Sequence, residues 1–184
     1  MAFSINFELQ DSDLDYFREE MRKAQEGSGE LDEQTILSSA KSVASSIADN
    51  TPDFIKHRID KLNTLVGMVE DSEWEIPAEE REDVLHALAY FANPQDLIPD
   101  NIPALGLIDD AIMIELVASG LQDEIEAFEE FCQYREREEK IRPSEETITR
   151  EEWLGAKRRE LHNRMKHRRT GRRRSSGSSF RSIF

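Results

Sequence analysis

Apolar residues recur at helical spacing along most of the chain, and this pattern predicts an all-α protein. Where apolar side chains fall at i, i+4 and i+7, one face of a helix packs inward. By this criterion, helices are expected over residues 14–25, 32–49, 52–69 and 77–92. In the third of these helices the expected buried stripe consists of Ile55, Ile59, Leu62, Val66 and Val69.

A longer helix is expected from about residue 107 to residue 142. Its first part, "AIMIELVASGL", is apolar on most sides, which places it at the centre of the bundle. Its end, "YREREEK", is polar all round and is expected to project into solvent. The buried stripe of this helix is expected to consist of Ile114, Val117, Leu121, Ile125, Phe128 and Cys132.

The first ten residues follow a different pattern of apolar and polar positions. Phe3, Ile5, Phe7 and Leu9 alternate with polar residues, and this period of two predicts an extended arm. A lone extended segment has no partner strand within a helical protein. Three outcomes stay open: the arm pairs with itself across a dimer, binds another protein, or docks its apolar face in a groove.

The C-terminal part divides into a helix and a tail. Thr149 and Glu152 form the pattern of a capping box for a last helix that runs through residue 169. From Thr170 onward the sequence "TGRRRSSGSSFRSIF" is rich in Arg, Ser and Gly and has no hydrophobic period. Such composition predicts disorder.

These elements predict a small helical bundle with a proline-rich loop between two core helices, an extended N-terminal arm and a disordered basic C-terminal tail. The parts along the chain are the arm with the first helix (1–30), a helical domain (31–142), a C-terminal basic helix (143–169) and the basic tail (170–184).

Charge is distributed unevenly along the chain. The formal net charge is −15, and residues 150–184 contain twelve Lys or Arg and three Glu, a net +9 that leaves −24 for residues 1–149. The basic end is expected either to bind the phosphates of nucleic acid or anionic lipid, or to lie on the acidic surface of the body. The residues expected to bind anions are Arg168, Arg169, Arg172, Arg173 and Arg174.

Residues 92–111, "ANPQDLIPDNIPALGLIDDA", interrupt the helical pattern. Pro94, Pro99 and Pro103 exclude a regular helix between them, because each proline removes a backbone donor and restricts the residue before it. The segment is also rich in Leu and Ile, which favours a loop that packs onto the helices. It further contains four carboxylates, those of Asp96, Asp100, Asp109 and Asp110.

Two interpretations of these four aspartates stay open. The first two follow a proline closely and suit Asx turns, and either of the last two suits the cap of the next helix. Alternatively, all four converge on Mg²⁺ or Ca²⁺, with His86 and Tyr90 on the preceding helix as an added ligand or base. The second arrangement would support metal-assisted hydrolysis, although the chain has no HExxH pair, P-loop or glycine-rich phosphate cradle.

The segment "LAYFANPQDLIPDNIPALGLIDDAIMI" closely resembles the signature of the YkvA-like bacterial domain-of-unknown-function family, over about residues 80–120. The resemblance implies a helical-hairpin module and no particular reaction. It also implies membrane association, since many members look membrane-associated, but charges at Asp109, Asp110 and Glu115 interrupt the apolar stretch that a span would need. The matching positions are Tyr90, Pro94, Asp96, Leu97, Ile98, Pro99, Asp100, Ile102, Pro103, Gly106, Leu107, Asp109 and Asp110.

These features favour a non-enzymatic, cytoplasmic interaction protein, with peripheral association at the inner membrane face as an option. The N-terminus has no secretory pattern, and the single cysteine, Cys132, excludes an intrachain disulfide and a cysteine-rich zinc site. No catalytic residue is assigned and no cofactor is expected unless the aspartates hold a divalent metal. The alternatives are a metal-dependent hydrolase centred on the aspartates and a nonspecific RNA-binding accessory protein that acts through the basic tail.

Overall fold

The computed structural model describes residues 8–27, 31–45, 51–92, 107–141 and 149–175. Within these ranges all regular elements are helical, which confirms the all-α prediction. The first seven residues of the predicted arm, the prolines of the loop and residues 176–184 lie outside the described ranges. The elements are α1 (Asp11–Gly27), α2 (Glu33–Ser45), α3 (Asp53–Glu70), α4 (Ala78–Leu88), the 3₁₀ turn η1 (Ala89–Ala92), α5 (Ile108–Gly120), α6 (Gln122–Ile141) and α7 (Arg150–Ser175).

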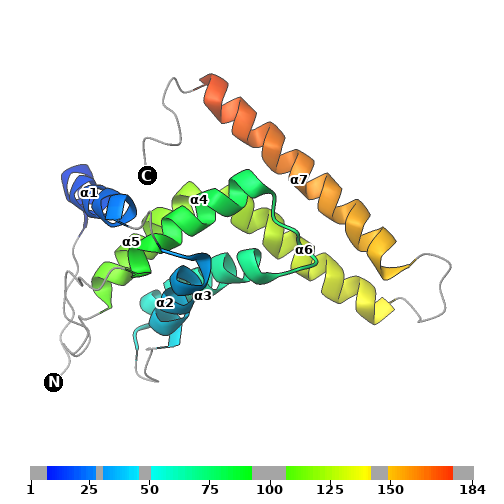
Figure 1. Ribbon diagram of the computed structural model, residues 1–184, viewed down its shortest axis with the longest axis horizontal. Helices are drawn as coiled ribbons and strands as arrows, with labels where there is room; N and C mark the ends of the chain where they lie inside the picture. The colour runs from blue at the N-terminus through cyan, green and yellow to red at the C-terminus, as the bar shows by residue number, and fades with distance from the viewer. Residues whose placement is uncertain (1–7, 28–30, 46–50, 93–106, 142–148, 176–184) are drawn as a thin grey trace.

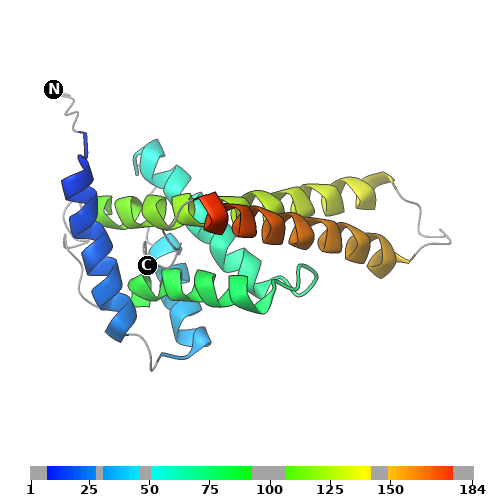
Figure 2. The ribbon, with the colours of Figure 1, turned by 90° about the horizontal axis from the view of Figure 1, so that it is seen from above.

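The helices form a cluster from which a long hairpin extends. Helix α3 lies at the centre of the cluster and packs against α2, α4, α5 and α6, while α1 crosses one end of α5 (Figures 1 and 2). Helices α6 and α7 run side by side in opposite directions in both views. The hairpin therefore joins the C-terminal helix to the body mainly through α6.

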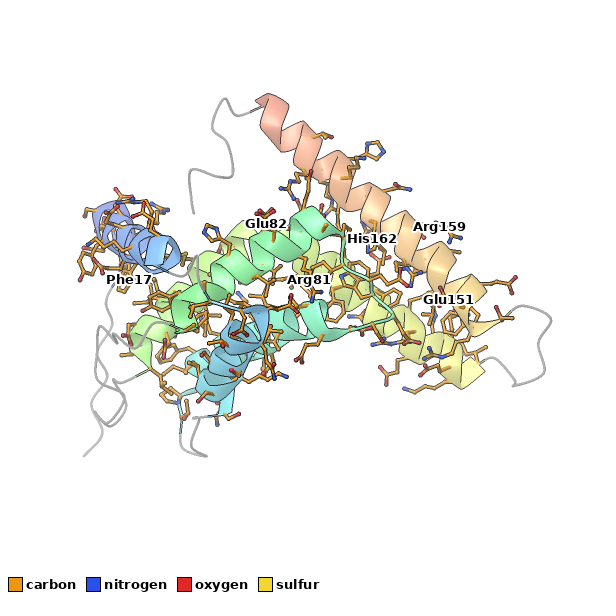
Figure 3. All side chains as sticks on the ribbon, viewed as in Figure 1. Phe17, Arg81, Glu82, Glu151, Arg159 and His162 are labelled. Atoms are coloured by element: carbon orange, nitrogen blue, oxygen red, sulfur yellow. The ribbon has the colours of Figure 1, made fainter. Side chains whose placement is uncertain are left out.

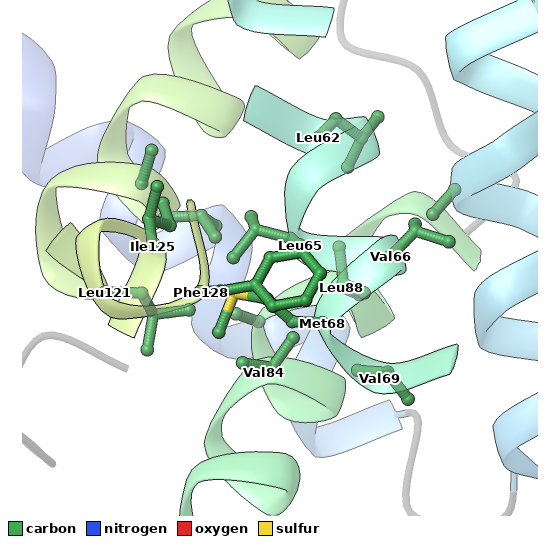
Figure 4. Close-up of a cluster of buried hydrophobic side chains, with 14 of the residues drawn as sticks. Leu62, Leu65, Val66, Met68, Val69, Val84, Leu88, Leu121, Ile125 and Phe128 are labelled. Carbon is green, nitrogen blue, oxygen red and sulfur yellow. The ribbon is translucent and has the colours of Figure 1, made fainter. Parts of the chain in front are cut away.

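The core gathers around the inner face of α3. Leu62, Leu65 and Met68 are fully buried there, and the ring of Phe128 from α6 reaches into the same cluster (Figure 4). The predicted stripe of α3 is confirmed, since all five of its members are buried. Burying apolar area of this extent is the main stabilising contribution to a helical bundle.

The long helix predicted from residue 107 to residue 142 is wrong as a single element. It bends at Leu121, whose φ and ψ are −109° and 23°, directly after Gly120. Backbone hydrogen bonds continue across the bend, from Leu121 N–H to the Val117 carbonyl (3.1 Å) and from Ile125 N–H to the Leu121 carbonyl (2.9 Å). The hydrophobic stripe therefore continues through the bend, which explains why the sequence pattern does not reveal it.

The sequence suggested that the polar end of α6 projects into solvent on all sides. In the structure, one side of it packs against α7. Tyr134 makes an edge-to-face contact with Trp153 of α7, with ring centroids 5.7 Å apart. Arg150 of α7 forms an ion pair with Glu139 near the end of α6. A single helix pattern cannot show such a partner, because α7 is separated from this part of α6 by the turn of the hairpin.

The start of α7 confirms the predicted capping box. The Glu152 carboxylate accepts hydrogen bonds from the Thr149 backbone N–H (2.7 Å) and hydroxyl (2.8 Å), and the Thr149 hydroxyl oxygen accepts one from the Glu152 backbone N–H (3.3 Å). The end of α7 differs from the prediction, because the helix continues to Ser175 rather than residue 169. Arginine has high helix propensity, so an arginine-rich run extends a helix that is already nucleated.

Candidate functional site

The structure describes only part of the proline-rich motif. The motif positions Tyr90, Leu107, Asp109 and Asp110 are described, whereas the motif residues between Pro94 and Gly106, Asp96 and Asp100 among them, lie outside the described ranges. Tyr90 is buried in η1 and packs edge-to-face on Phe91 with ring centroids 5.2 Å apart. The tyrosine therefore contributes to the core on the α4 side of the motif.

The two aspartates at the end of the motif lie in the first turn of α5. Asp109 is only 2% exposed and Asp110 is half-buried, and both carboxylates lie at the positive end of the helix dipole. The prediction that one of them occupies the cap position is wrong, because Leu107 holds that position and makes no side-chain capping bond.

The metal hypothesis is not supported by the part of the chain that is described. In these ranges no group of three or more His, Cys, Asp or Glu side chains is placed to hold a metal ion. Among the predicted ligands, His86 is exposed on α4, whereas Tyr90 and Asp109 are buried. Because Asp96 and Asp100 are not described, a site that includes them stays a prediction.

An apolar groove lies between α1, α3 and α5, and we call it the α5 groove. Its volume is about 280 Å³, and its walls are mostly apolar. Phe54 at its edge is 47% exposed, a large value for a phenylalanine. The lining residues are Leu9, Leu14, Phe54, Arg58, Ile108, Ala111, Ile112, Glu115, Leu116 and Ser119.

The α5 groove arises because α5 is apolar on nearly all of its faces. Met113, Ile114 and Val117 are fully buried against the core. Ile112 and Leu116 lie on another face and stay only half-buried, because α1 and α3 cover that face incompletely. The sequence placed this helix at the centre of the bundle. The uncovered face was missed, although apolar residues on every side of a helix are the signal that each face needs a partner.

One carboxylate and two basic side chains form ion pairs at the rim of the α5 groove. The Glu115 carboxylate forms ion pairs with Arg58 (3.1 Å) and Lys61 (2.9 Å) of α3. Arg58 also donates a hydrogen bond to the backbone carbonyl of Phe54 (2.9 Å). The groove therefore offers an apolar floor beside a closed set of ion pairs, which suits an apolar ligand better than a charged one.

Several basic side chains of α7 form ion pairs with carboxylates of the body. Arg168 forms ion pairs with Asp123 (2.9 Å) and Glu126 (3.1 Å) of α6, and Arg169 reaches Asp83 of α4 (2.8 Å). Two of the five residues expected to bind anions are thus held within the molecule. The side chains of the other three, Arg172, Arg173 and Arg174, are not described.

Glu130 of α6 is the shared partner of two basic residues of α7. Its carboxylate accepts hydrogen bonds from Arg164 (2.5 Å) and Lys157 (2.6 Å). These two bonds, that from Arg164 first, hold the pKa of Glu130 below its ordinary value despite an opposing effect of burial. The Glu130 carboxylate therefore stays ionised to lower pH than an ordinary glutamate.

Comparison with known proteins gives one family match. Residues 84–116 match a family described as "Protein of unknown function (DUF1232)". The matched segment runs from α4 through η1 into α5, and Ile108, Ala111, Ile112, Glu115 and Leu116 of the α5 groove lie in it. No curated protein and no solved structure matches the chain. None of the helices in the described ranges has the length and apolar character needed to span a membrane.

Proposed function

We propose that this chain is a non-enzymatic interaction protein that self-associates by placing the apolar N-terminal arm of one copy in the α5 groove of a second copy. The observation on which the proposal rests is the half-exposed apolar lining formed by Leu9, Leu14, Phe54, Ile112 and Leu116. Exposed apolar surface of this kind is stabilised when a complementary apolar segment covers it. We also propose the YkvA-like family as the group to which the matched segment belongs, on the motif residues set out above.

The sequence supplies a segment with the complementary chemistry. Phe3, Ile5 and Phe7 present an apolar edge directly before Leu9, which already lines the groove. Leu9 of the same copy already takes up part of this groove. A lone extended segment has no partner strand within a helical protein. A second copy is the occupant that we favour.

An exchange of arms is consistent with the length of the arm. Seven extended residues span up to about 24 Å, which is enough to cross from one copy to another when two α1 helices lie together. Such an exchange gives a closed two-fold dimer, because each copy donates one arm and offers one groove.

The experiment is sedimentation equilibrium of the full chain over a range of concentrations. Wild type is compared with Ile112→Asp, which charges the groove, and with a triple variant in which Phe3, Ile5 and Phe7 are each replaced by Ser. Ile141→Asp is the matched control, because Ile141 is an apolar residue that is 68% exposed on α6, far along the chain from the groove. We expect a dimer for wild type and for Ile141→Asp, and a monomer for the other two.

Three results would overturn the proposal. A monomeric wild type excludes self-association, and a lower melting temperature of the monomeric arm variant would then assign the groove to the arm of the same copy. A dimer that survives Ile112→Asp places the interface elsewhere. A dimer lost equally in Ile141→Asp shows that the α5 groove has no special role.

A second candidate function, binding to an anionic membrane surface, is favoured by the composition of α7. The apolar face of α7, which includes Trp153, Leu161 and Met165, is buried against the body, whereas Arg159 and Lys166 are exposed. Exposed basic side chains attract anionic lipid headgroups. The chain is expected to co-sediment with phosphatidylglycerol vesicles but not with phosphatidylcholine vesicles. Equal binding to the two kinds of vesicle, or binding to neither, would contradict this function.

A further inference from the structure

The contact between α7 and the body centres on one aromatic pair. Trp74, in the connection between α3 and α4, is fully buried and packs edge-to-face on His162 of α7, with ring centroids 4.5 Å apart. The Trp74 ring also contacts Phe131 (5.2 Å) and Phe128 (5.7 Å) of α6. Figure 3 places His162 on the side of α7 that faces the body, and Arg159 on the outer side.

The connection between α3 and α4 holds Trp74 in this position. The Asp71 side chain accepts hydrogen bonds from the backbone N–H groups of Glu73 (2.9 Å) and Trp74 (3.0 Å). Glu75 follows with a left-handed φ of 46°, which few residues other than glycine adopt. The turn therefore holds the indole in place against α6 and α7.

Two polar atoms at this contact are shielded from solvent. In the described ranges, neither Nε1 of Trp74 nor Nε2 of His162 has a hydrogen-bond partner. Buried polar atoms are normally paired, because leaving one unpaired destabilises the folded state. The two rings are thus in contact without a hydrogen bond at either of these atoms, and the contact provides no acceptor for an extra proton on Nε2 of His162.

The charged groups around His162 do not favour protonation of its ring, which would place a second positive charge beside that of Arg158. On α7 itself, Arg158 lies one turn before it and forms an ion pair with Glu75 (3.1 Å). Arg158 also donates a hydrogen bond to the backbone carbonyl of Glu73 (2.8 Å). On α6, Arg135 is paired with Asp71 (2.8 Å) and Glu73 (2.9 Å), and Glu130 is paired with Lys157 and Arg164. The nearby carboxylates are therefore already matched by arginine or lysine.

These surroundings lower the pKa of His162 below its ordinary value. Burial is the largest cause and the charge of Arg158 the second, while Glu75 and a hydrogen bond to the Trp74 backbone oppose them. A group whose folded-state pKa is depressed stabilises the fold above its ordinary pKa, and that stability is lost as pH falls through the folded-state value. For histidine the loss begins below about pH 6.5.

We propose that α7 is a pH-sensitive clasp, which loosens from the α3–α4 connection and α6 when His162 is protonated. Loosening exposes Trp74 and weakens the cover that α7 gives to the carboxylates of α6. The ion pairs of Glu130 persist as pH falls below about 6.5, because its carboxylate titrates only at lower pH. A loosening of α7 between about pH 6.5 and the range in which carboxylates titrate is therefore assigned to His162. The clasp does not depend on the arm and groove of the proposed function.

Acrylamide quenching of Trp74 fluorescence tests the clasp. The chain has two tryptophans, so Trp153→Phe leaves Trp74 as the single reporter. In this background we expect the quenching constant to rise as pH is lowered from about 7.5 to about 5.5. Adding His162→Phe keeps a ring against Trp74 but removes the proton site, and it should abolish the rise. His167→Gln is the matched control, because His167 is exposed on the same helix, and it should leave the rise unchanged.

Hydrogen exchange of the unmodified chain keeps the proposal falsifiable if the double variant does not fold. As pH is lowered, the protection of α7 amides should fall relative to that of α3 amides at the same pH. The expected fall is up to about tenfold for each pH unit by which the folded-state pKa of His162 lies below the ordinary pKa of histidine. An unchanged ratio over this pH range overturns the clasp. So does a rise in quenching that survives His162→Phe or disappears in His167→Gln.

Discussion

At the scale of single residues, Trp74 is the centre of a buried aromatic cluster. This side chain is fully buried and contacts rings from α6 and α7. Trp74 lies between the helices expected over residues 52–69 and 77–92, and the sequence gave no sign of its burial, because its three ring partners lie on helices distant along the chain. Cys132, expected in the core, is half-buried, and burial is the main cause that raises the pKa of its thiol.

Trp74→Ala is expected to destabilise the fold by about 3–5 kcal/mol, since it leaves a large cavity between the α3–α4 connection, α6 and α7. Urea unfolding followed by circular dichroism measures this loss. Trp153→Phe, at a more peripheral contact with Tyr134, is the control and is expected to cost far less. A loss below about 1 kcal/mol for Trp74→Ala would show that the ring is not part of the cooperative core.

Gly67→Ala is expected to stabilise the fold by up to about 1 kcal/mol, because alanine favours a helix interior over glycine. A Cβ atom at Gly67 would lie 3.5 Å from Cε1 of Phe128, an ordinary van der Waals contact. Gly171→Ala is the comparison, since a Cβ there meets no atom within 4 Å. Thermal melts decide the sign, and a lower melting temperature for Gly67→Ala would show that α3 and α6 cannot accommodate the methyl group.

At the scale of elements, the sequence predicts what depends on local rules and fails where a distant partner decides. The stripe of α3 and the capping box of Thr149 with Glu152 follow from spacing alone. The bend at Leu121 does not, because hydrogen bonding and hydrophobic spacing both continue through it. The α5 groove was missed for a related reason: the pattern shows that α5 is apolar all round but not which face its neighbours leave open.

Glu130→Gln is expected to weaken the packing of α7 by about 1 kcal/mol, as two partly exposed ion pairs are lost. The carboxylate has a depressed pKa, so its contribution is present above the ordinary pKa of glutamate and is lost as pH falls through the folded-state pKa. The difference in stability between wild type and variant should therefore shrink in acid.

The control for this prediction is Glu136→Gln on the same helix, whose ion pair with Lys140 is about 70% exposed on both sides. Urea unfolding at neutral and acidic pH should show no measurable change for that variant. A Glu130→Gln variant as stable as wild type at neutral pH, or a difference that grows in acid, would contradict the account of the pair.

At the scale of the whole molecule, the chain has two surfaces of different character, one charged and one apolar. The acidic body, with a formal charge of −24, is partly covered by the basic helix α7. The α5 groove lies elsewhere, beside the start of α1, and is apolar. The sequence predicted both the charge division and the apolar arm. The position of the groove required the fold, since its walls come from three helices.

The most direct test of the central claim is to mix two defective variants. Ile112→Asp keeps its arm but has a charged groove, whereas the triple Ser variant of Phe3, Ile5 and Phe7 keeps its groove but has a polar arm. Each is expected to be monomeric alone. Mixed in equal amounts, they should form a heterodimer with one intact contact between arm and groove, measured as a dimer mass by sedimentation equilibrium. Because the heterodimer has one contact where wild type has two, it should form only at higher concentration than the wild-type dimer. A mixture that stays monomeric even far above the concentrations at which wild type is dimeric would contradict exchange of the arm between copies.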